Sequence, residues 1–225
     1  MRELILGAPV TVVWLALFGG WTAIDSTSAG QVMISRPFAA ATLAGWIAGD
    51  PVAGVVVGIV LEAFHLCILP VGAARNPEAG PASVVAGASY ALAPHQPSVL
   101  LMAVAFALAW EWVSGESVRQ VRQVNVRLVA RDPEPRSRTI ERRHLLAVLI
   151  DFARGVLLVV VGFVLLSLLL HLSIPRWGLG ERIPHLVLGA VVVGLFASTL
   201  RFFGTRVKLF LAGAVVGLLL LRLHP

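Results

Sequence analysis

The chain has 225 residues, of which 58% are hydrophobic and 13% are charged, and its mean hydropathy is +0.88. A soluble domain carries about 25% charged residues, so the composition excludes an ordinary soluble enzyme and indicates an all-α, polytopic transmembrane helical bundle. The net charge of +6 does not predict nucleic-acid binding, because basic residues collect in the cytoplasmic loops of membrane proteins. The single cysteine, Cys67, excludes an internal disulfide and a multi-cysteine metal site, and no cofactor is expected.

We expect one membrane domain over residues 1–225, beginning with helices of unequal length. Residues 4–21 are apolar and just long enough to cross a bilayer. Residues 25–36 are small and polar, which is typical of a loop or of a segment that lines a cavity. The apolar stretch 38–49 is too short for a simple span and fits a re-entrant or broken helix.

The next helix is predicted to begin at Pro51, with the Asp50 side chain as its N-cap. Residues 52–69 are long enough to cross the membrane and carry Glu62 deep in the apolar run. Gly54 and Gly58 have the spacing that allows close approach of a neighbouring helix.

Residues 70–81 hold three prolines and two glycines, so they cannot form a regular helix. A second short apolar segment follows at residues 81–92. In transporters, broken segments of this kind point to the binding site. The polar stretch 24–83, which lies within the N-terminal helical region of residues 1–113, is therefore the predicted substrate site.

Residues 97–113 are predicted to span, and residues 114–143 then change character and form an arginine-rich cytoplasmic loop by the positive-inside rule. Its alternative interpretation is a patch that binds anionic lipid or a partner. The loop's arginines are Arg119, Arg122, Arg127, Arg131, Arg136, Arg138, Arg142 and Arg143.

The C-terminal region, residues 144–225, is predicted to hold three further spans at 145–172, 184–200 and 207–223. Asp151 and Arg154 are three residues apart near the start of the first of these spans and could pair on one helix face. Motifs of soluble enzymes, such as a phosphate-binding loop or a zinc-binding HExxH sequence, are absent, so we expect no catalytic residue.

Ionisable side chains within membrane segments are costly and usually mark functional sites. A sugar needs carboxylates, amides and hydroxyls that bond its own hydroxyl groups, because unpaired buried groups are penalised. The predicted substrate-binding residues are Asp25, Ser28, Gln31, Glu62, Asn76 and Glu78. Arg36, Asp50 and Arg75 are assigned to charge pairing or to structure. The alternative is that these charges pair with one another as a scaffold and contact no ligand.

A dense, ordered set of acidic, small and proline positions runs through residues 24–83, and it continues more thinly to residue 154. Its members include Asp25, Arg36, Pro37, Gly45, Gly49, Asp50, Gly54, Gly58, Leu61, Glu62, Val71, Gly72, Ala73, Pro77, Ala82 and Ser83. This pattern resembles the IIC membrane subunit of the mannose/fructose/sorbose family of the bacterial sugar phosphotransferase system.

The resemblance implies a helical membrane unit in the bacterial cytoplasmic membrane that works with a IID-like membrane subunit. Together they translocate a hexose or related sugar. Cytoplasmic IIA and IIB proteins carry the phosphoryl groups and phosphorylate the sugar, so the chain by itself is not an enzyme. The arginine-rich loop then lies on the side where IIB docks.

Two other functions remain open at this level. One is a regulatory or assembly membrane protein with the same fold that no longer moves sugar. The other is an unrelated secondary transporter coupled to protons through Glu62.

Overall fold

The computed structural model describes residues 9–66, 76–129, 137–178, 180–203 and 208. All regular secondary structure in these residues is helical, which confirms the predicted all-α membrane bundle. The elements in chain order are α2 (Pro9–Thr27), α3 (Pro37–Ala48), α4 (Pro51–His65), α5 (Ala79–Ala91), α6 (Pro97–Val129), α7 (Ser137–Ser173), the short 3₁₀ turn η1 (Ile174–Arg176) and α8 (Arg182–Phe203).

Helices α3, α4 and α5 form a tight group because glycines let their backbones meet. A Cβ atom on Gly54 of α4 would lie 3.0 Å from the Cα atoms of Gly45 and Thr42 on α3. A Cβ atom on Gly87 of α5 would lie 2.6 Å from the carbonyl oxygen of Ala41. The close contact predicted for α4 is therefore confirmed, and it is made with α3.

The predicted boundary between α3 and α4 is also confirmed. Gly49 ends α3 with a φ of 97°, a left-handed conformation that glycine adopts without steric cost. The Asp50 carboxylate then accepts a hydrogen bond from the backbone N–H of Ala53 at 3.0 Å, and Pro51 occupies the first turn of α4.

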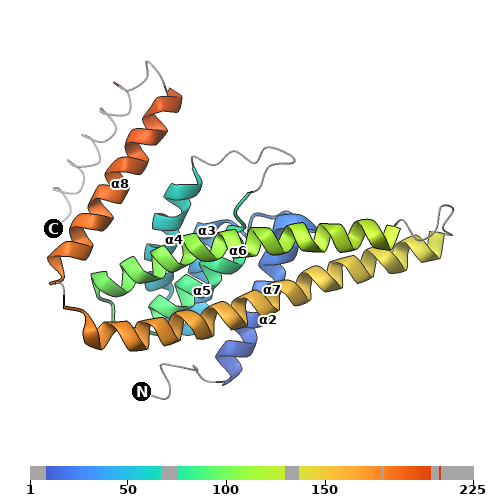
Figure 1. Ribbon diagram of the computed structural model, residues 1–225, viewed down its shortest axis with the longest axis horizontal. Helices are drawn as coiled ribbons and strands as arrows, with labels where there is room; N and C mark the ends of the chain where they lie inside the picture. The colour runs from blue at the N-terminus through green and yellow to red at the C-terminus, as the bar shows by residue number, and fades with distance from the viewer. Residues whose placement is uncertain (1–8, 67–75, 130–136, 179, 204–207, 209–225) are drawn as a thin grey trace.

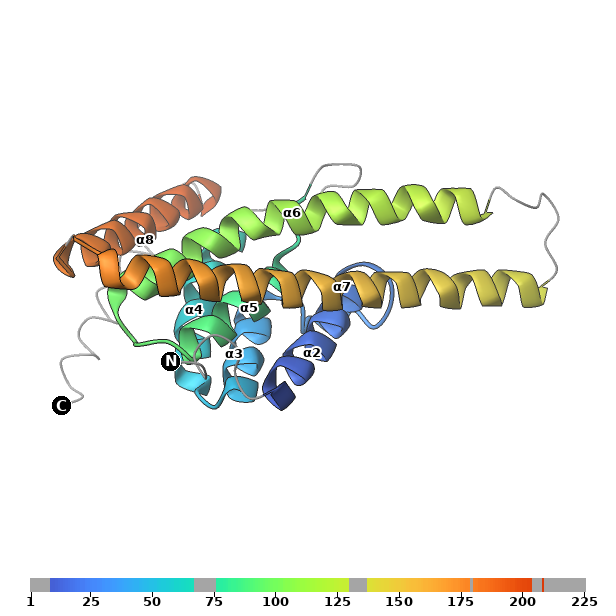
Figure 2. The same cartoon turned by 60° about the horizontal axis from the view of Figure 1, so that its bottom comes forward.

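Helices α6 and α7 are much longer than the other helices and lie side by side as a hairpin (Figures 1 and 2). They have 33 and 37 residues, which corresponds to about 50 and 55 Å. The prediction of a loop at residues 114–143 was wrong, because α6 continues to Val129 and α7 begins at Ser137. The residues between Gly115 and Val129 include no proline and are rich in Arg and Gln, which favour a helix once one has started.

Helix α2 packs across α7 through small residues. Cβ atoms on Gly20 and Gly155 would both lie within about 2.5 Å of the opposite helix, Gly20 against the ring of Phe152 and Gly155 against Ala23. Contrary to the predicted polar segment 25–36, α2 continues through Thr27, so Asp25 lies on a helix and is buried.

Three helices of the described chain are long and apolar enough to cross a membrane: α2, most of α6, and α7. Helix α4 has 15 residues and is shorter than the predicted span of 52–69, whose last residues are not among those described. Helix α8 extends away from the other helices (Figure 1). The predicted last span, 207–223, also lies outside the described residues, apart from Lys208.

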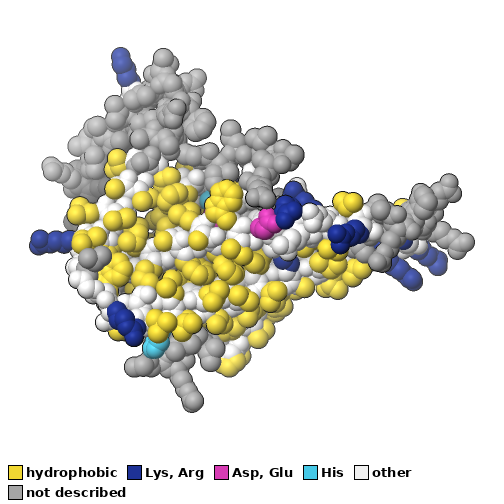
Figure 3. All heavy atoms as spheres, in the orientation of Figure 1, with side chains coloured by type: hydrophobic (Ala, Val, Ile, Leu, Met, Phe, Trp, Pro, Cys, Tyr) yellow, Lys and Arg dark blue, Asp and Glu magenta, His cyan; other side chains and the backbone are white. Residues whose placement is uncertain are grey.

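Apolar side chains cover much of the face formed by α6 and α7, and basic side chains gather toward the far end of the hairpin (Figure 3). On α7, Leu157, Leu165, Leu168 and Leu172 are between 43% and 64% exposed. Large exposed apolar surfaces of this kind mark contact with lipid or a partner. The chain is a multi-pass membrane protein.

Candidate functional site

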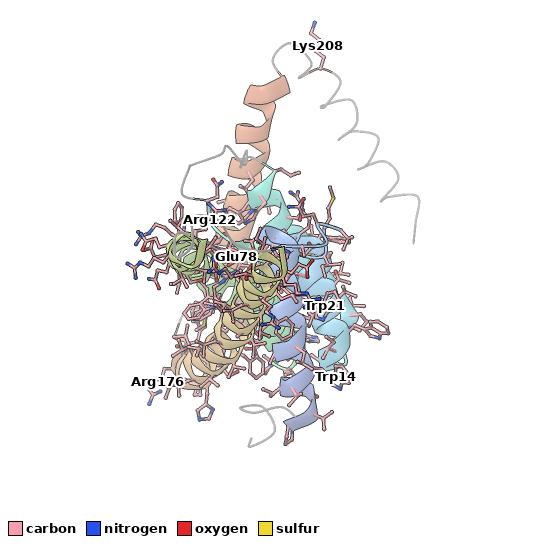
Figure 4. All side chains as sticks on the ribbon, turned by 90° about the vertical axis from the view of Figure 1, so that its right-hand side faces the viewer. Trp14, Trp21, Glu78, Arg122, Arg176 and Lys208 are labelled. Atoms are coloured by element: carbon pink, nitrogen blue, oxygen red, sulfur yellow. The ribbon has the colours of Figure 1, made fainter. Side chains whose placement is uncertain are left out.

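A belt of polar side chains crosses the bundle where the end of α2, the start of α5 and the middles of α6 and α7 meet. At its centre, the Arg154 guanidinium donates to both oxygens of the Glu78 carboxylate, at 2.5 Å and 2.8 Å. The Arg154 and Glu78 side chains are only 7% and 5% exposed. Figure 4 shows Glu78 among the helices, whereas Arg122 and Arg176 lie on the outside. A buried bidentate pair of this kind fixes the geometry of both partners.

The predicted pairing of Asp151 with Arg154 is confirmed. Nε of Arg154 donates to the Asp151 carboxylate at 2.8 Å, and both side chains are buried. The Thr27 hydroxyl donates to the same carboxylate, as does the Ser28 hydroxyl at 2.5 Å. The last turn of α2 is thereby tied to α7.

Ser26 extends this network to a second carboxylate. Its hydroxyl donates to Glu78 at 2.8 Å. Ser28 and Glu78, both predicted to bind substrate, therefore have partners within the protein. Each already belongs to the ionic network that joins α2, α5 and α7.

Asp25 has a comparable internal role. One carboxylate oxygen accepts from the backbone N–H of Val32 at 2.6 Å, and the other accepts from the N–H and hydroxyl of Ser35 at 2.9 Å and 2.7 Å. Gln31 lies in the turn held in this way, with a φ of 49°, and is exposed. Asp25 therefore shapes the connection from α2 to α3.

Glu62 lies in a different environment from Asp25 and Glu78. Near the end of α4, it forms an ion pair with Arg36 and accepts a hydrogen bond from the backbone N–H of Phe38 at 3.2 Å. Its side chain remains 21% exposed, and that of Arg36 remains 48% exposed. Glu62 is thus a carboxylate that a ligand can reach, next to a half-exposed guanidinium and the start of α3.

Sequence reasoning missed Glu111, which is 2% exposed in the middle of α6. Its carboxylate lies 3.0 Å from Nε2 of His65, and its carbonyl oxygen accepts from the backbone N–H of Glu78 at 3.0 Å. His65 is one turn after Glu62 on α4, so this pair extends the belt from the Glu78 centre toward Glu62. The signal was present in the sequence, because Glu111 is an ionisable residue within the apolar run of α6.

The other predicted residues are Asn76, Asp50 and Arg75. Asn76 is exposed, and its backbone runs against Gly115 of α6. Asp50 lies at the opposite end of α4 from Glu62, where it caps the helix and lies 3.4 Å from His95. Arg75 lies outside the described residues. Among the residues that are described, no cluster of three or more His, Cys, Asp or Glu side chains could hold a metal ion.

The fold and the polar belt define a polytopic helical membrane protein with an ionic centre and an accessible carboxylate at its rim. Comparison with known families identifies the group to which it belongs. The family model of the sorbose-specific IIC component of the phosphotransferase system matches residues 8–177, and the chain belongs to this family. The predicted resemblance is confirmed.

Two of the matching solved structures illustrate the shared fold. One, described as a membrane protein, has 22% sequence identity and a TM-score of 0.66, with 92% of this chain and 85% of that chain covered. The other is the mannose transporter ManYZ in a complex with a microcin, with 21% identity, a TM-score of 0.58, and coverage of 93% and 86%. The comparison with curated proteins finds no match.

Proposed function

We propose that this chain is the sugar-translocating IIC subunit of a phosphotransferase system that takes up a sugar of the mannose/fructose/sorbose class. Membership of the sorbose-specific IIC family supports the membrane component, and the likeness to a mannose transporter supports the fold. We place the protein in the bacterial cytoplasmic membrane. Its proposed partners are a IID-like membrane subunit and cytoplasmic IIA and IIB phosphocarriers, which supply the phosphoryl group.

The observation that carries the proposal is the accessible carboxylate of Glu62 at the rim of a buried ionic belt. A sugar hydroxyl can donate to Glu62, and other hydroxyls can bond the exposed Arg36. The same hydrogen bonds would discriminate between sugars, because a sugar that lacks a matching hydroxyl leaves a desolvated protein group unpaired. Asn76 and Gln31 are exposed amides and complete the proposed substrate-binding set.

Within this proposal, Asp25, Ser28 and Glu78 position the site and do not contact sugar. Their oxygens accept from or donate to other parts of the chain, as the hydrogen bonds of Asp25 and Glu78 illustrate. The acids near the belt therefore divide into the buried groups Asp25, Glu78 and Glu111 and the partly exposed Glu62, whose side chain is 21% exposed. This division explains how a site with several carboxylates can be built without leaving uncompensated charge in the membrane.

The test is phosphoenolpyruvate-dependent phosphorylation of a panel of hexoses and amino sugars. Membranes would contain this chain with its IID-like partner, and cognate IIA and IIB would be added. We expect one or a few sugars to be phosphorylated and the activity to be lost when this chain is omitted. A well-assembled complex that phosphorylates nothing across the panel would contradict the proposal and favour the regulatory or assembly role. Uptake driven by a proton gradient without a phosphoryl donor would favour the secondary transporter.

A further inference from the structure

A cavity lies in the bundle away from the ionic belt. Its volume is about 160 Å³, and it lies between the end of α5 and the C-terminal turns of α7, next to η1. Ser167, on its wall, follows Arg154 by 13 residues, which corresponds to about 20 Å along α7. Most of the wall is apolar and is formed by Leu92, Pro94, Phe163, Leu170, Ile174 and Pro175.

The size and lining of the cavity suit a short length of hydrocarbon chain. An apolar protein cavity of roughly 150 Å³ holds a benzene molecule, which has six carbon atoms. The cavity in this bundle has room for a similar number of carbons. Phe163 and Leu170, both buried, provide apolar contacts for them.

One buried hydroxyl group in this wall lacks a partner. Ser89 is 3% exposed, and within the part of the chain that the structure describes its hydroxyl makes no hydrogen bond. A serine in a helix often donates to the carbonyl oxygen one turn back, but Ser89 does not. Because an unpaired buried polar group is costly, an acceptor inside the cavity would stabilise it. A fitting ligand therefore has an apolar body and an acceptor such as an ester carbonyl.

The outer side of the same turns of α7 is apolar. Leu168, Leu169 and Leu172 are neighbours of the wall residues in the sequence, and they are between 40% and 47% exposed. They lie in the last turns of the candidate membrane span that runs from Arg138 to Arg176. Exposed leucines within a span contact the acyl chains of lipid. The acyl chains of the membrane are therefore the apolar molecules nearest to the cavity.

A cationic group adjoins the cavity wall. Arg176 directly follows Pro175, and its guanidinium donates to the carbonyl oxygen of Leu172 at 2.6 Å. Among the residues that the structure describes, no ion pair involves Arg176, which lies on the outside of the bundle (Figure 4). An arginine at the end of a span reaches the membrane interface, and its guanidinium matches the geometry of phosphate. This charge favours a lipid with an anionic headgroup.

We propose that the cavity is a binding site for an anionic phospholipid of the surrounding membrane. Part of one acyl chain lies in the cavity, an ester carbonyl accepts from the Ser89 hydroxyl, and Arg176 binds the phosphate. The bound lipid joins the end of α5 to the end of the long hairpin. The site uses neither Glu62 nor the ionic belt, so the inference goes beyond the proposed sugar transport and does not depend on it.

The test measures lipid binding to the purified full chain by native mass spectrometry. Delipidated protein receives phosphatidylglycerol, phosphatidylcholine with the same acyl chains, or the corresponding free fatty acid. We expect one phosphatidylglycerol molecule to bind the wild type about fivefold more tightly than phosphatidylcholine, which is the effect of one basic residue near an anionic lipid. The free fatty acid should bind more weakly than phosphatidylglycerol, because it lacks the phosphate and the second chain.

Substitutions at the two polar groups separate the contacts with the headgroup and the ester. Arg176→Gln should lose most of the preference for phosphatidylglycerol, whereas Arg176→Lys, which keeps the charge, should retain it. Ser89→Ala should weaken binding of both phospholipids about threefold through loss of one hydrogen bond. Ser83→Ala is the matched control, because it removes another buried, unpartnered hydroxyl of α5 that is not part of the cavity wall, and it should bind as the wild type does.

Ser167→Leu fills the cavity and should abolish binding of one phospholipid molecule. Circular dichroism shows whether this variant is folded, and the surface variant Arg176→Gln carries the test if it is not. Wild-type binding by folded Ser167→Leu would overturn the proposed site, as would an unchanged headgroup preference in Arg176→Gln. Fatty acid that binds as tightly as phosphatidylglycerol would also overturn it, because the cavity would then select a chain and not a phospholipid.

Discussion

Arg154 and Glu78 are 76 residues apart in the sequence, yet the guanidinium of one donates to both carboxylate oxygens of the other in the interior of the bundle. Asp151 shares the same arginine. One cation is thus bound by two buried carboxylates, and through them it connects α7 to the start of α5 and to the end of α2. This centre joins the N-terminal helices to the long hairpin.

Replacing Arg154 by Met should therefore destabilise the fold. The change leaves two buried carboxylates without a cation, and breaking a buried pair in this way costs about 3–5 kcal/mol. Thermal unfolding of the detergent-solubilised protein measures the effect. Replacing the exposed Arg119 by Met is the control, and it should change the unfolding midpoint little because the pair with Glu116 is solvated. Similar midpoints for the two variants would show that the buried centre does not hold the fold.

Gly54→Ala should also destabilise the protein, for a steric reason. The added methyl group would meet the backbone of α3, which cannot move aside as a flexible side chain can, so a cost of about 1–3 kcal/mol is expected. Gly189→Ala on α8 is the matched control, because a Cβ atom there meets nothing within 4 Å. The control should be neutral or slightly stabilising, since alanine favours a helix more than glycine does. Unfolding midpoints that do not separate the two variants would contradict the close packing of α3 on α4.

Asp50→Ala should lower stability by about 1 kcal/mol through loss of the N-cap of α4. Asp50→Asn should retain most of that stability, because an amide oxygen can accept the same bond from Ala53. Neither change should alter which sugar is taken up, since Asp50 is twelve residues, or about 18 Å, from Glu62 along α4. A changed sugar preference in either variant would place Asp50 in the binding site.

Local signals in the sequence were enough to predict much of the fold. Proline at a helix start, Asp50 as a cap and glycines at helix contacts each act within a few residues, so the boundary between α3 and α4 could be predicted. The region predicted as a loop at residues 114–143 is mostly helical, because α6 continues to Val129 and α7 begins at Ser137, whereas its cytoplasmic side stays a prediction. Arginine and glutamine are good helix formers in water, and the hairpin continues through them.

The sequence identified most of the charged residues of the candidate site, but only some of the contacts between them. Glu78 and Asp25 were singled out as intramembrane acids, but their hydrogen-bond partners lie on other helices or in a following turn. No sequence spacing shows that Glu78 meets Arg154 or that Glu111 meets His65, because those contacts depend on how the helices pack. The sequence therefore identified charged positions without separating buried positioning groups from the reachable Glu62.

The central claim is that Glu62 recognises the sugar while the buried acids support it. Glu62→Gln keeps the size of the side chain and an acceptor for the Phe38 N–H, but it removes the negative charge. Asp50→Asn is the matched control, because it removes the same charge from the other end of the same helix and retains the cap. Both variants are compared at equal amounts of assembled complex in the membrane.

The most direct measurement is phosphoenolpyruvate-dependent uptake of the substrate sugar by cells that carry each variant with its partner subunits. We predict that Glu62→Gln lowers uptake at least about tenfold, equivalent to about 1.4 kcal/mol of lost binding or transition-state stabilisation, and that Asp50→Asn leaves it unchanged. Uptake by Glu62→Gln at the wild-type rate would contradict the account and show that Glu62 is part of the scaffold.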